Sequence, residues 1–402
     1  PLVVNPNAGL PVTHDGVTQF EVGSEEFAAT MLEFAPQTAL LGGCCGTTPQ
    51  HIKALVESCA ELPPPEKRNG APECITGYGA PVCFDRMPVI IGERINPTGK
   101  KRLKEALKAG DMDYVCQLAL EQIDKGAQVL DVNVGVPGID EPALLEKAMR
   151  TLQSITPLPL QIDTSDLKAM ERALRLYNGR PLLNSVNGKT SSLSSVLPLA
   201  KKYGAMFVLL PLSDEGLPKD GEEKKHIIET VYDRAMEMGM AHEDIVVDGL
   251  VATIGANPEA ARECYETIAY CKDVRKLPTI CGLSNISFGL PERMYVNTAF
   301  LTMAICEGLT MAIANPSQEL LMNAAFASDM LLHRPDSDIR YIERMNRLAE
   351  QKAEYETVVV KKTPAESTGQ KESSGADAID AIKIIRFLQL SSKEAKERFS
   401  MK

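Results

Sequence analysis

The chain has 402 residues with a formal net charge of −11, 44% hydrophobic residues and 24% charged residues. This composition is typical of a globular enzyme and argues against a disordered or fibrous chain, and the length suggests two or three structural units. The acidic balance argues against a nucleic-acid partner, because no broad basic surface is present to release counterions from a phosphate backbone.

The apolar runs and the cysteines indicate the compartment. No apolar run reaches the ~18 residues that a membrane span needs, and no basic segment followed by an apolar one opens the chain. The ten cysteines are scattered through a long sequence, which favours reduced thiols over a disulfide framework. We therefore expect a cytoplasmic protein without a membrane partner. Because Pro1 lies inside an apolar run, we also expect the sequence to start within a longer gene product.

Residues 1–60 contain two apolar runs that each end in a turn rich in Gly or Asn. PLVVNPNAG starts at Pro1 and TALLGGCCGT starts at Thr38, and a helix is expected from Pro49. These elements look like the last βα units of a second barrel whose beginning is absent. Residues 61–84 are rich in Pro and Gly. They show neither the alternation of a strand nor the period of a helix, so a linker is predicted there.

Residues 85–356 are predicted to form one domain. Between Met87 and Gln318 this segment repeats one alternation: a short apolar run, a polar cluster, and an amphipathic stretch of helical period. Several of the helical stretches open on start signals, such as Asp166, Ser191 and Asn257. Eight parallel strands with intervening helices close into a (β/α)₈ TIM barrel of roughly 250 residues, and an open doubly wound sheet is the alternative. The predicted strands are Pro88–Ile95, Gln128–Val134, Leu158–Asp163, Leu182–Val186, Ala205–Leu212, Ile245–Leu250, Thr279–Ile286 and Leu309–Ala314.

The end of the chain differs in composition from the barrel segment. Residues 357–376 are dominated by Ser, Lys and Glu and are too polar to bury themselves, so they are predicted to be a tether. Residues 377–402 are predicted to form a short helical tail.

Polar side chains end seven of the eight runs, at the edge where (β/α)₈ barrels carry their chemistry. Asn and Asp around such a mouth offer paired donors and acceptors to a flat, nitrogen-rich heterocycle. A single residue of this kind is more often a helix cap or turn former, an alternative that seven occurrences weaken. No His ends a run, which argues against an imidazole base or a His-rich metal site in the barrel.

The strand endings carry a family resemblance. GERINPTG, DVNVG, QIDTS, NSVNG, VDG and GLSNISFG, in this order, resemble the pterin-binding methyltransferases over about residues 87–350. They resemble specifically the methyltetrahydrofolate domain of cobalamin-dependent methionine synthases. NPNAG and GGCCGT resemble the end of the zinc-dependent homocysteine-binding barrel of those enzymes. The resemblance implies transfer of the N5 methyl of 5-methyltetrahydrofolate to cob(I)alamin, as a step of methionine synthesis from homocysteine.

The resemblance also assigns roles to single residues. It implies that Asp163, Asn184 and Asp248 bind the pterin ring, and that Asn285 lies near N5 as the catalytic residue. An amine anion leaves poorly, so a hydrogen bond from Asn285 at N5 would stabilise the departing tetrahydrofolate. The further candidates for contact with the pterin are Glu93, Asn96, Asp131, Asn133 and Ser165.

The resemblance implies two cofactors besides folate. Cys44 and Cys45 resemble two of three thiolate ligands to the zinc that activates homocysteine, but the third Cys is absent. We therefore expect zinc in the intact parent protein and none retained by this chain. The sequence after residue 376 is too short for a cobalamin-binding domain and contains no D-x-H-x-x-G motif. The cobalamin is expected on a missing domain or a separate protein.

Three alternatives to this interpretation are open. A dihydropteroate synthase shares the fold and the pterin, but AIANPSQE at the eighth strand lacks the Arg and His expected for its pyrophosphate substrate. A methyltransferase that acts on a separate corrinoid protein has a similar barrel, and GGCCGT argues against it. The third alternative is a folate-binding chain without catalytic activity.

Overall fold

The computed structural model describes residues 2–63, 73–84 and 87–362, with side chains up to residue 351. The chain divides into two compact units, Pro1–Tyr341 and Ile342–Lys402. Helix α12 (Ser337–Lys362) runs into the second unit and includes the first residues of the predicted tether. The rest of the tether and the predicted helical tail lie outside the described residues. Within the described part of the chain, no helix is long and apolar enough to cross a membrane.

The N-terminal segment forms a small α/β cluster. Strand β1 (Val3–Val4) pairs in parallel with β4 (Leu40–Leu41), and β2 (Pro11–His14) pairs with β3 (Val17–Phe20) as a hairpin. Helices α1 (Ser24–Phe34) and α2 (Pro49–Cys59) pack together through Phe27, Met31 and Leu55, and η1 (Ala35–Gln37) follows α1. Both predicted strands and the helix at Pro49 are confirmed, whereas the hairpin and α1 were not predicted. Two parallel strands do not make a barrel, so the second barrel stays a prediction.

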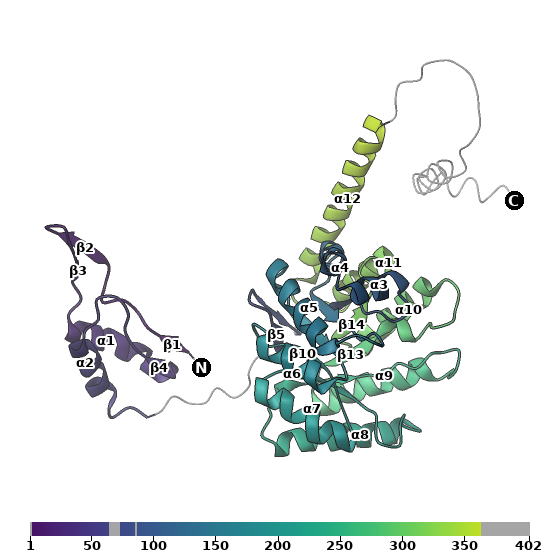
Figure 1. The fold of residues 1–402 in the computed structure, drawn as a ribbon, viewed down its shortest axis with the longest axis horizontal. Helices are drawn as coiled ribbons and strands as arrows, with labels where there is room; N and C mark the ends of the chain where they lie inside the picture. The colour runs from purple at the N-terminus through teal and green to yellow at the C-terminus, as the bar shows by residue number, and fades with distance from the viewer. Residues whose placement is uncertain (1, 64–72, 85–86, 363–402) are drawn as a thin grey trace. The chain divides into compact units, whose positions relative to one another are not determined.

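All eight strands of the predicted barrel are present and parallel, in a closed sheet that runs from β7 through β14 and back to β7. Their number, order and closure confirm the (β/α)₈ prediction and rule out the open sheet. Helices surround the strands (Figure 1). The strands are β7 (Val89–Ile95), β8 (Val129–Val132), β9 (Leu160–Asp163), β10 (Leu182–Asn187), β11 (Met206–Leu210), β12 (Ile245–Asp248), β13 (Thr279–Gly282) and β14 (Met311–Ala314).

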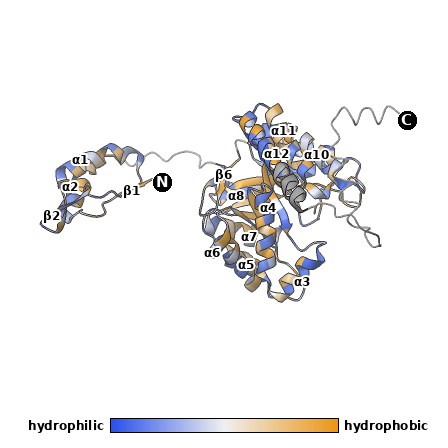
Figure 2. Cartoon of the chain, turned by 90° about the horizontal axis from the view of Figure 1, so that it is seen from above, coloured by the Kyte–Doolittle hydropathy of each residue, from blue (hydrophilic) through white to orange (hydrophobic). Residues whose placement is uncertain are grey.

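The helices follow the expected amphipathic pattern, with a buried face toward the strands and a polar face outward, as the mixed colours of α4 in Figure 2 show. Asp166 caps α6 by accepting hydrogen bonds from the N–H groups of Lys168 and Ala169, as its sequence predicted. The helices of the barrel are α3 (Lys101–Ala109), α4 (Met112–Asp124), α5 (Glu141–Ile155), α6 (Leu167–Leu176), α7 (Thr190–Tyr203), α8 (Gly221–Glu237), α9 (Ala260–Tyr270), α10 (Arg293–Glu307) and α11 (Glu319–Leu331), with short helices η2 (His242–Asp244), η3 (Cys271–Arg275) and η4 (Leu283–Asn285).

A hairpin closes the end of the barrel where the strands begin. It consists of β5 (Cys74–Thr76) and β6 (Pro81–Cys83), and Thr76 bridges to Arg180, just before β10. Ile75 is fully buried in the cluster that fills the barrel interior. The prediction of a linker over residues 61–84 is therefore wrong for this stretch, because the barrel structure already begins at Cys74. Residues 64–72 lie outside the described part, and the other predicted boundaries stay predictions.

Because Ile75 seals the barrel interior, Ile75→Ala should lower the free energy of unfolding by about 2–4 kcal/mol, the usual cost of truncating a buried aliphatic side chain. Urea denaturation followed by circular dichroism measures this change. Tyr78→Ala is the matched control, since Tyr78 lies in the same hairpin with 53% of its surface exposed. A similar loss for both variants would show that the hairpin does not contribute through its buried face.

Candidate active site at the carboxyl ends of the strands

Asp163, at the end of β9, joins three neighbouring strand ends. Its Oδ2 accepts hydrogen bonds from Asn133 Nδ2 at 3.0 Å, after β8, and from Asn96 Nδ2 at 3.4 Å, after β7. Asn184 of β10 lies beside Asp163 in the strand register. Within the described part of the chain, Oδ1 of Asp163 accepts no hydrogen bond. One oxygen is therefore fixed by the two amides and the other remains available to a ligand.

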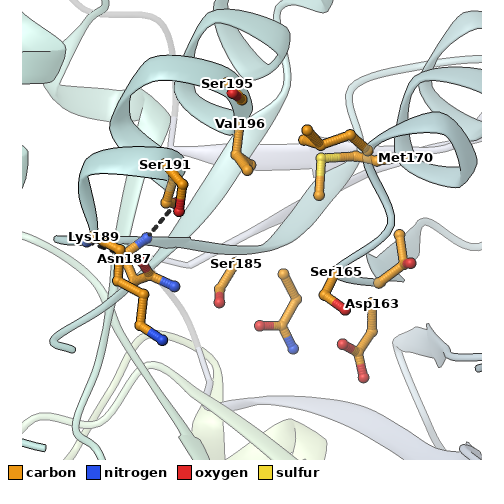
Figure 3. A pocket seen from close by; sticks show the side chains of 13 residues that line it. Asp163, Ser165, Met170, Ser185, Asn187, Lys189, Ser191, Ser195 and Val196 are labelled. Carbon is orange, nitrogen blue, oxygen red and sulfur yellow. Dashed lines mark hydrogen bonds between the residues drawn. The ribbon is translucent and has the colours of Figure 1, made fainter. Parts of the chain in front are cut away.

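A cavity of about 320 Å³ opens beside this carboxylate (Figure 3). Asp163, Ser165 and Asn184 line it at the strand ends, and Met170 and Val196 add apolar surface from α6 and α7. This volume is at the lower end of the range for small-molecule sites, which suits a compact heterocycle. The full lining is Asp163, Thr164, Ser165, Leu167, Met170, Asn184, Ser185, Asn187, Lys189, Ser191, Ser192, Ser195 and Val196.

Two further acidic candidates lie close to this group. Asp131 is buried and accepts a hydrogen bond from Gln161 Nε2 at 2.7 Å, and burial together with the Asp163 charge raises its pKa well above the usual value. Glu93 accepts hydrogen bonds from Ser284 Oγ at 3.0 and 3.3 Å, which joins the ends of β7 and β13. Lys100, whose pKa burial lowers, donates to the carbonyl oxygens of Glu93 and Asn96.

The carboxyl groups of Asp163 and Asp248 have unusual proton affinities. Burial raises the pKa of Asp163 to about 6, against the hydrogen bond from Asn133 and with a further increase from the Glu141 charge. Burial also raises the pKa of Asp248 to about 6, opposed by the N–H of Leu250 and by the charge of Lys224. Two carboxyl groups with shifted pKa values at one edge of a barrel are typical of a functional site.

Asn285 stands apart from these acids. It ends η4, just after β13, with an exposed side chain. A Cβ at Gly282 would lie 3.0 Å from Asn285 Nδ2, so glycine there leaves room for the amide. Arg293 holds the segment by donating to Ser284 O at 2.5 Å and to Ser287 Oγ at 3.0 Å. Among the described residues, Asn285 makes no side-chain hydrogen bond to the other candidates.

The structure thus brings Asn96, Asn133, Asn184 and Ser165 around Asp163, whereas Asp248 and Asn285 lie at other strand ends of the same edge. Sequence reasoning missed four residues that support them. No strand-end pattern marks these side chains, because two lie in helices, one precedes a helix and one faces inward along a strand. They are Lys100, Gln161, Lys224 and Arg293.

Cys44 and Cys45 lie in an exposed loop with their Sγ atoms 3.8 Å apart. The loop is tied to the other predicted motif, because Asn7 accepts a hydrogen bond from Cys45 N at 3.1 Å and Pro6 O accepts one from Cys44 N at 2.8 Å. Within the described ranges, no group of three His, Cys, Asp or Glu side chains is placed to hold a metal ion.

Two family models match the chain. The pterin binding enzyme model matches residues 92–315, which contain all the strand-end candidates, and the homocysteine S-methyltransferase model matches residues 1–59. Solved structures share the barrel: dihydropteroate synthase from Yersinia pestis aligns with a TM-score of 0.51 at 18% identity, covering 65% of this chain and 98% of that one. Dihydropteroate synthase from Clostridium difficile gives 0.50 at 21% identity, covering 61% and 97%. At these identities the likeness shows the fold alone.

Two curated relatives match most of this chain. Methionine synthase of Mycobacterium tuberculosis is 31% identical over 87% of this chain and 31% of its own length. Methionine synthase of Mycobacterium leprae is 31% identical over 80% of this chain and 29% of its own length. The chain therefore spans about a third of these relatives, and the resemblance indicated by the strand endings is confirmed. Since the pterin binding enzyme model covers more than half of the residues, the chain belongs to the pterin binding enzyme family.

Proposed function

We propose that the barrel mouth binds 5-methyltetrahydrofolate and transfers its N5 methyl to a cobalamin held by another domain or protein, as a step in methionine synthesis from homocysteine. The observation that carries the proposal is the Asp163 side chain, which lines a cavity and has one carboxylate oxygen fixed by two amides. The family and the methionine synthase relatives support the pterin and the methyl transfer.

The pterin ring presents neighbouring N–H donors along one edge, which a carboxylate accepts well. Asp163 and Asp248 would accept from such donors, and the amide of Asn184 would both donate and accept at adjacent ring atoms. Asn96 and Asn133 would orient Asp163 rather than bind the ring themselves, because their amides already donate to it. The remaining candidates, Glu93, Asp131 and Ser165, would shape the mouth.

Cob(I)alamin, when bound, would supply the nucleophile that takes the methyl group. The residues of this chain would then stabilise the electron density that builds on N5 as the carbon–nitrogen bond breaks. Asn285 is exposed at the end of β13 and can donate its amide N–H there without being an acid. Arg293 would keep the segment that carries Asn285 in place.

The zinc of the parent enzymes does not fit the donors in this chain. Two adjacent thiols fall short of the four ligands of a structural zinc or the three protein ligands of a catalytic one. We expect less than about one-tenth of an equivalent of zinc after dialysis of the purified chain, since two thiolates bind it weakly. Metal analysis measures this content; one equivalent that is lost on Cys44→Ser would contradict the expectation.

The test of the proposed function is methyl transfer by the purified chain. 5-Methyltetrahydrofolate and free cob(I)alamin are incubated with the chain, and methylcobalamin is followed by absorbance. Formation of methylcobalamin faster than without protein supports the proposal. Tight folate binding without transfer would instead indicate a folate-binding module, and absence of folate binding would overturn the proposal.

A further inference from the structure

Lys224 is a buried lysine that the proposed mechanism does not use. It lies in the first turn of α8 with 4% of its surface exposed, and its Nζ donates to the carbonyl oxygen of Gly249 at 3.3 Å. A buried ammonium is costly unless acceptors and a counter-charge compensate for the lost water. Gly249 follows Asp248 directly in the sequence, so the ammonium lies against the turn that presents a proposed pterin ligand.

The turn from Asp248 to Leu250 is held from several sides. A Cβ at Gly249 would meet the Sγ atoms of Cys264 and Cys281 at 2.7 and 3.0 Å, so only glycine fits against this pair of thiols. Leu250 has φ +52°, a left-handed conformation that is unfavourable for a branched side chain. Its N–H donates to Asp248 Oδ1 at 2.8 Å, and Lys224 holds the carbonyl between them.

We propose that Lys224 is a positioning residue, whose buried ammonium fixes the Asp248–Leu250 turn and supplies the counter-charge that lets the Asp248 carboxylate accept the pterin. The inference rests on the proposed function, because it assigns pterin binding to Asp248. Lys224 itself does not touch the ligand in this arrangement and acts through Asp248.

One lysine, one aspartate and a set of cysteine thiols are the titratable groups that face this turn. Lys224 interacts electrostatically with Asp248 of β12 and with the Cys271 thiol of η3. Burial raises the pKa of Cys271 to about 12, and the neighbouring Cys264 thiol and burial raise that of Cys281 well above its usual value, so both thiols stay neutral to pH 9. The Asp248 carboxyl, with a pKa near 6, therefore titrates within the range in which folate binding is measured.

The experiment is the pH profile of 5-methyltetrahydrofolate affinity between pH 5.5 and 9 for the full chain. Lys224→Met should raise the pH at which affinity is lost by about one unit, since the nearby cation no longer favours ionised Asp248. At pH 6.5 its affinity should fall by about 3-fold, and at pH 9 it should be within about twofold of the unsubstituted chain. Lys225→Met is the matched control: Lys225 is 36% exposed, pairs with Glu222, and should leave the profile unchanged.

A second substitution and a second background keep the result unambiguous. Lys224→Gln retains a donor for the Gly249 carbonyl but not the charge, so it should shift the profile in the same direction and replaces Lys224→Met if that variant does not fold. In an Asp248→Asn background, Lys224→Met should cause no further pH-dependent change.

Three results would overturn the inference and leave the proposed function standing. An equal loss of affinity at every pH would show that Lys224 is only structural, and an unshifted profile would show that it is irrelevant to the site. The same shift without Asp248 would show that it acts elsewhere. Absence of folate binding by the unsubstituted chain at any pH would refute the proposed function itself, and the inference with it.

Discussion

Asn285→Ala should slow methyl transfer at saturating folate by about 10²-fold or more, the scale of losing one donor that acts in the transition state. Folate affinity should change little, because the hydrogen bond from Asn285 strengthens only as N5 takes up electron density. The structure is consistent with such a role: the amide lies exposed at the end of β13, and it makes no side-chain hydrogen bond to the other candidates among the described residues.

Single-turnover transfer to excess cob(I)alamin isolates the chemical step, and equilibrium titration gives the folate affinity separately. Asn315→Ala is the control, since Asn315 also follows a barrel strand but its Oδ1 accepts the N–H of Ser317, as a turn residue does. The Asn315 variant should transfer methyl at the unsubstituted rate. If Asn285→Ala does so too, Asn285 is only a turn residue at the strand end.

The eight strands of the barrel were predictable because each is buried on both faces. Such strands read as continuous Val, Ile and Leu runs, as in MFVLL at Met206–Leu210, and the runs recur at a spacing that leaves room for one helix each. The hairpin at Cys74–Cys83 was missed, because its two strands have three residues each and lie in a segment rich in Pro and Gly. Ile75 is buried because it packs against barrel strands that are distant in sequence, so the residues around it do not predict its burial.

The ring of polar strand ends was predictable for the same reason, but the pairing within it was not. Asn96 and Asn133 reach Asp163 because of the register of β7, β8 and β9, and that register shifts between Gly92 and Ile95. No sequence pattern predicts such a shift in register. Burial within a helix was also not predictable for lysines. Lys224 and Lys225 are adjacent in sequence, yet only Lys224 is buried.

Asp163→Asn should weaken folate binding at pH 8 by about 1.5–3 kcal/mol, the scale of losing a hydrogen bond to a charged group. The substitution keeps the shape of the side chain, and its oxygen can still accept from Asn96 and Asn133. The difference should shrink as the pH falls through about 6, because the Asp163 carboxyl then becomes neutral in the unsubstituted chain as well. Titration of folate at pH 5.5 and pH 8 measures both values, and an equal difference at the two pH values would exclude the charge as the cause.

The same substitution should stabilise the chain without ligand. Burial raises the pKa of Asp163 from 3.8 to about 6, so the folded state disfavours the ionised carboxyl. The contribution of this group to stability is fully present below pH 3.8 and is lost as the pH rises through about 6. At pH 8, Asp163→Asn should therefore raise the free energy of unfolding by about 1–3 kcal/mol, and near pH 4 it should have little effect. Asp273→Asn, on an exposed side chain, is the control for loss of one negative charge. Urea denaturation measures the free energy of unfolding. An unchanged or lower value for Asp163→Asn at pH 8 would show that the ionised Asp163 carboxyl does not destabilise the folded chain.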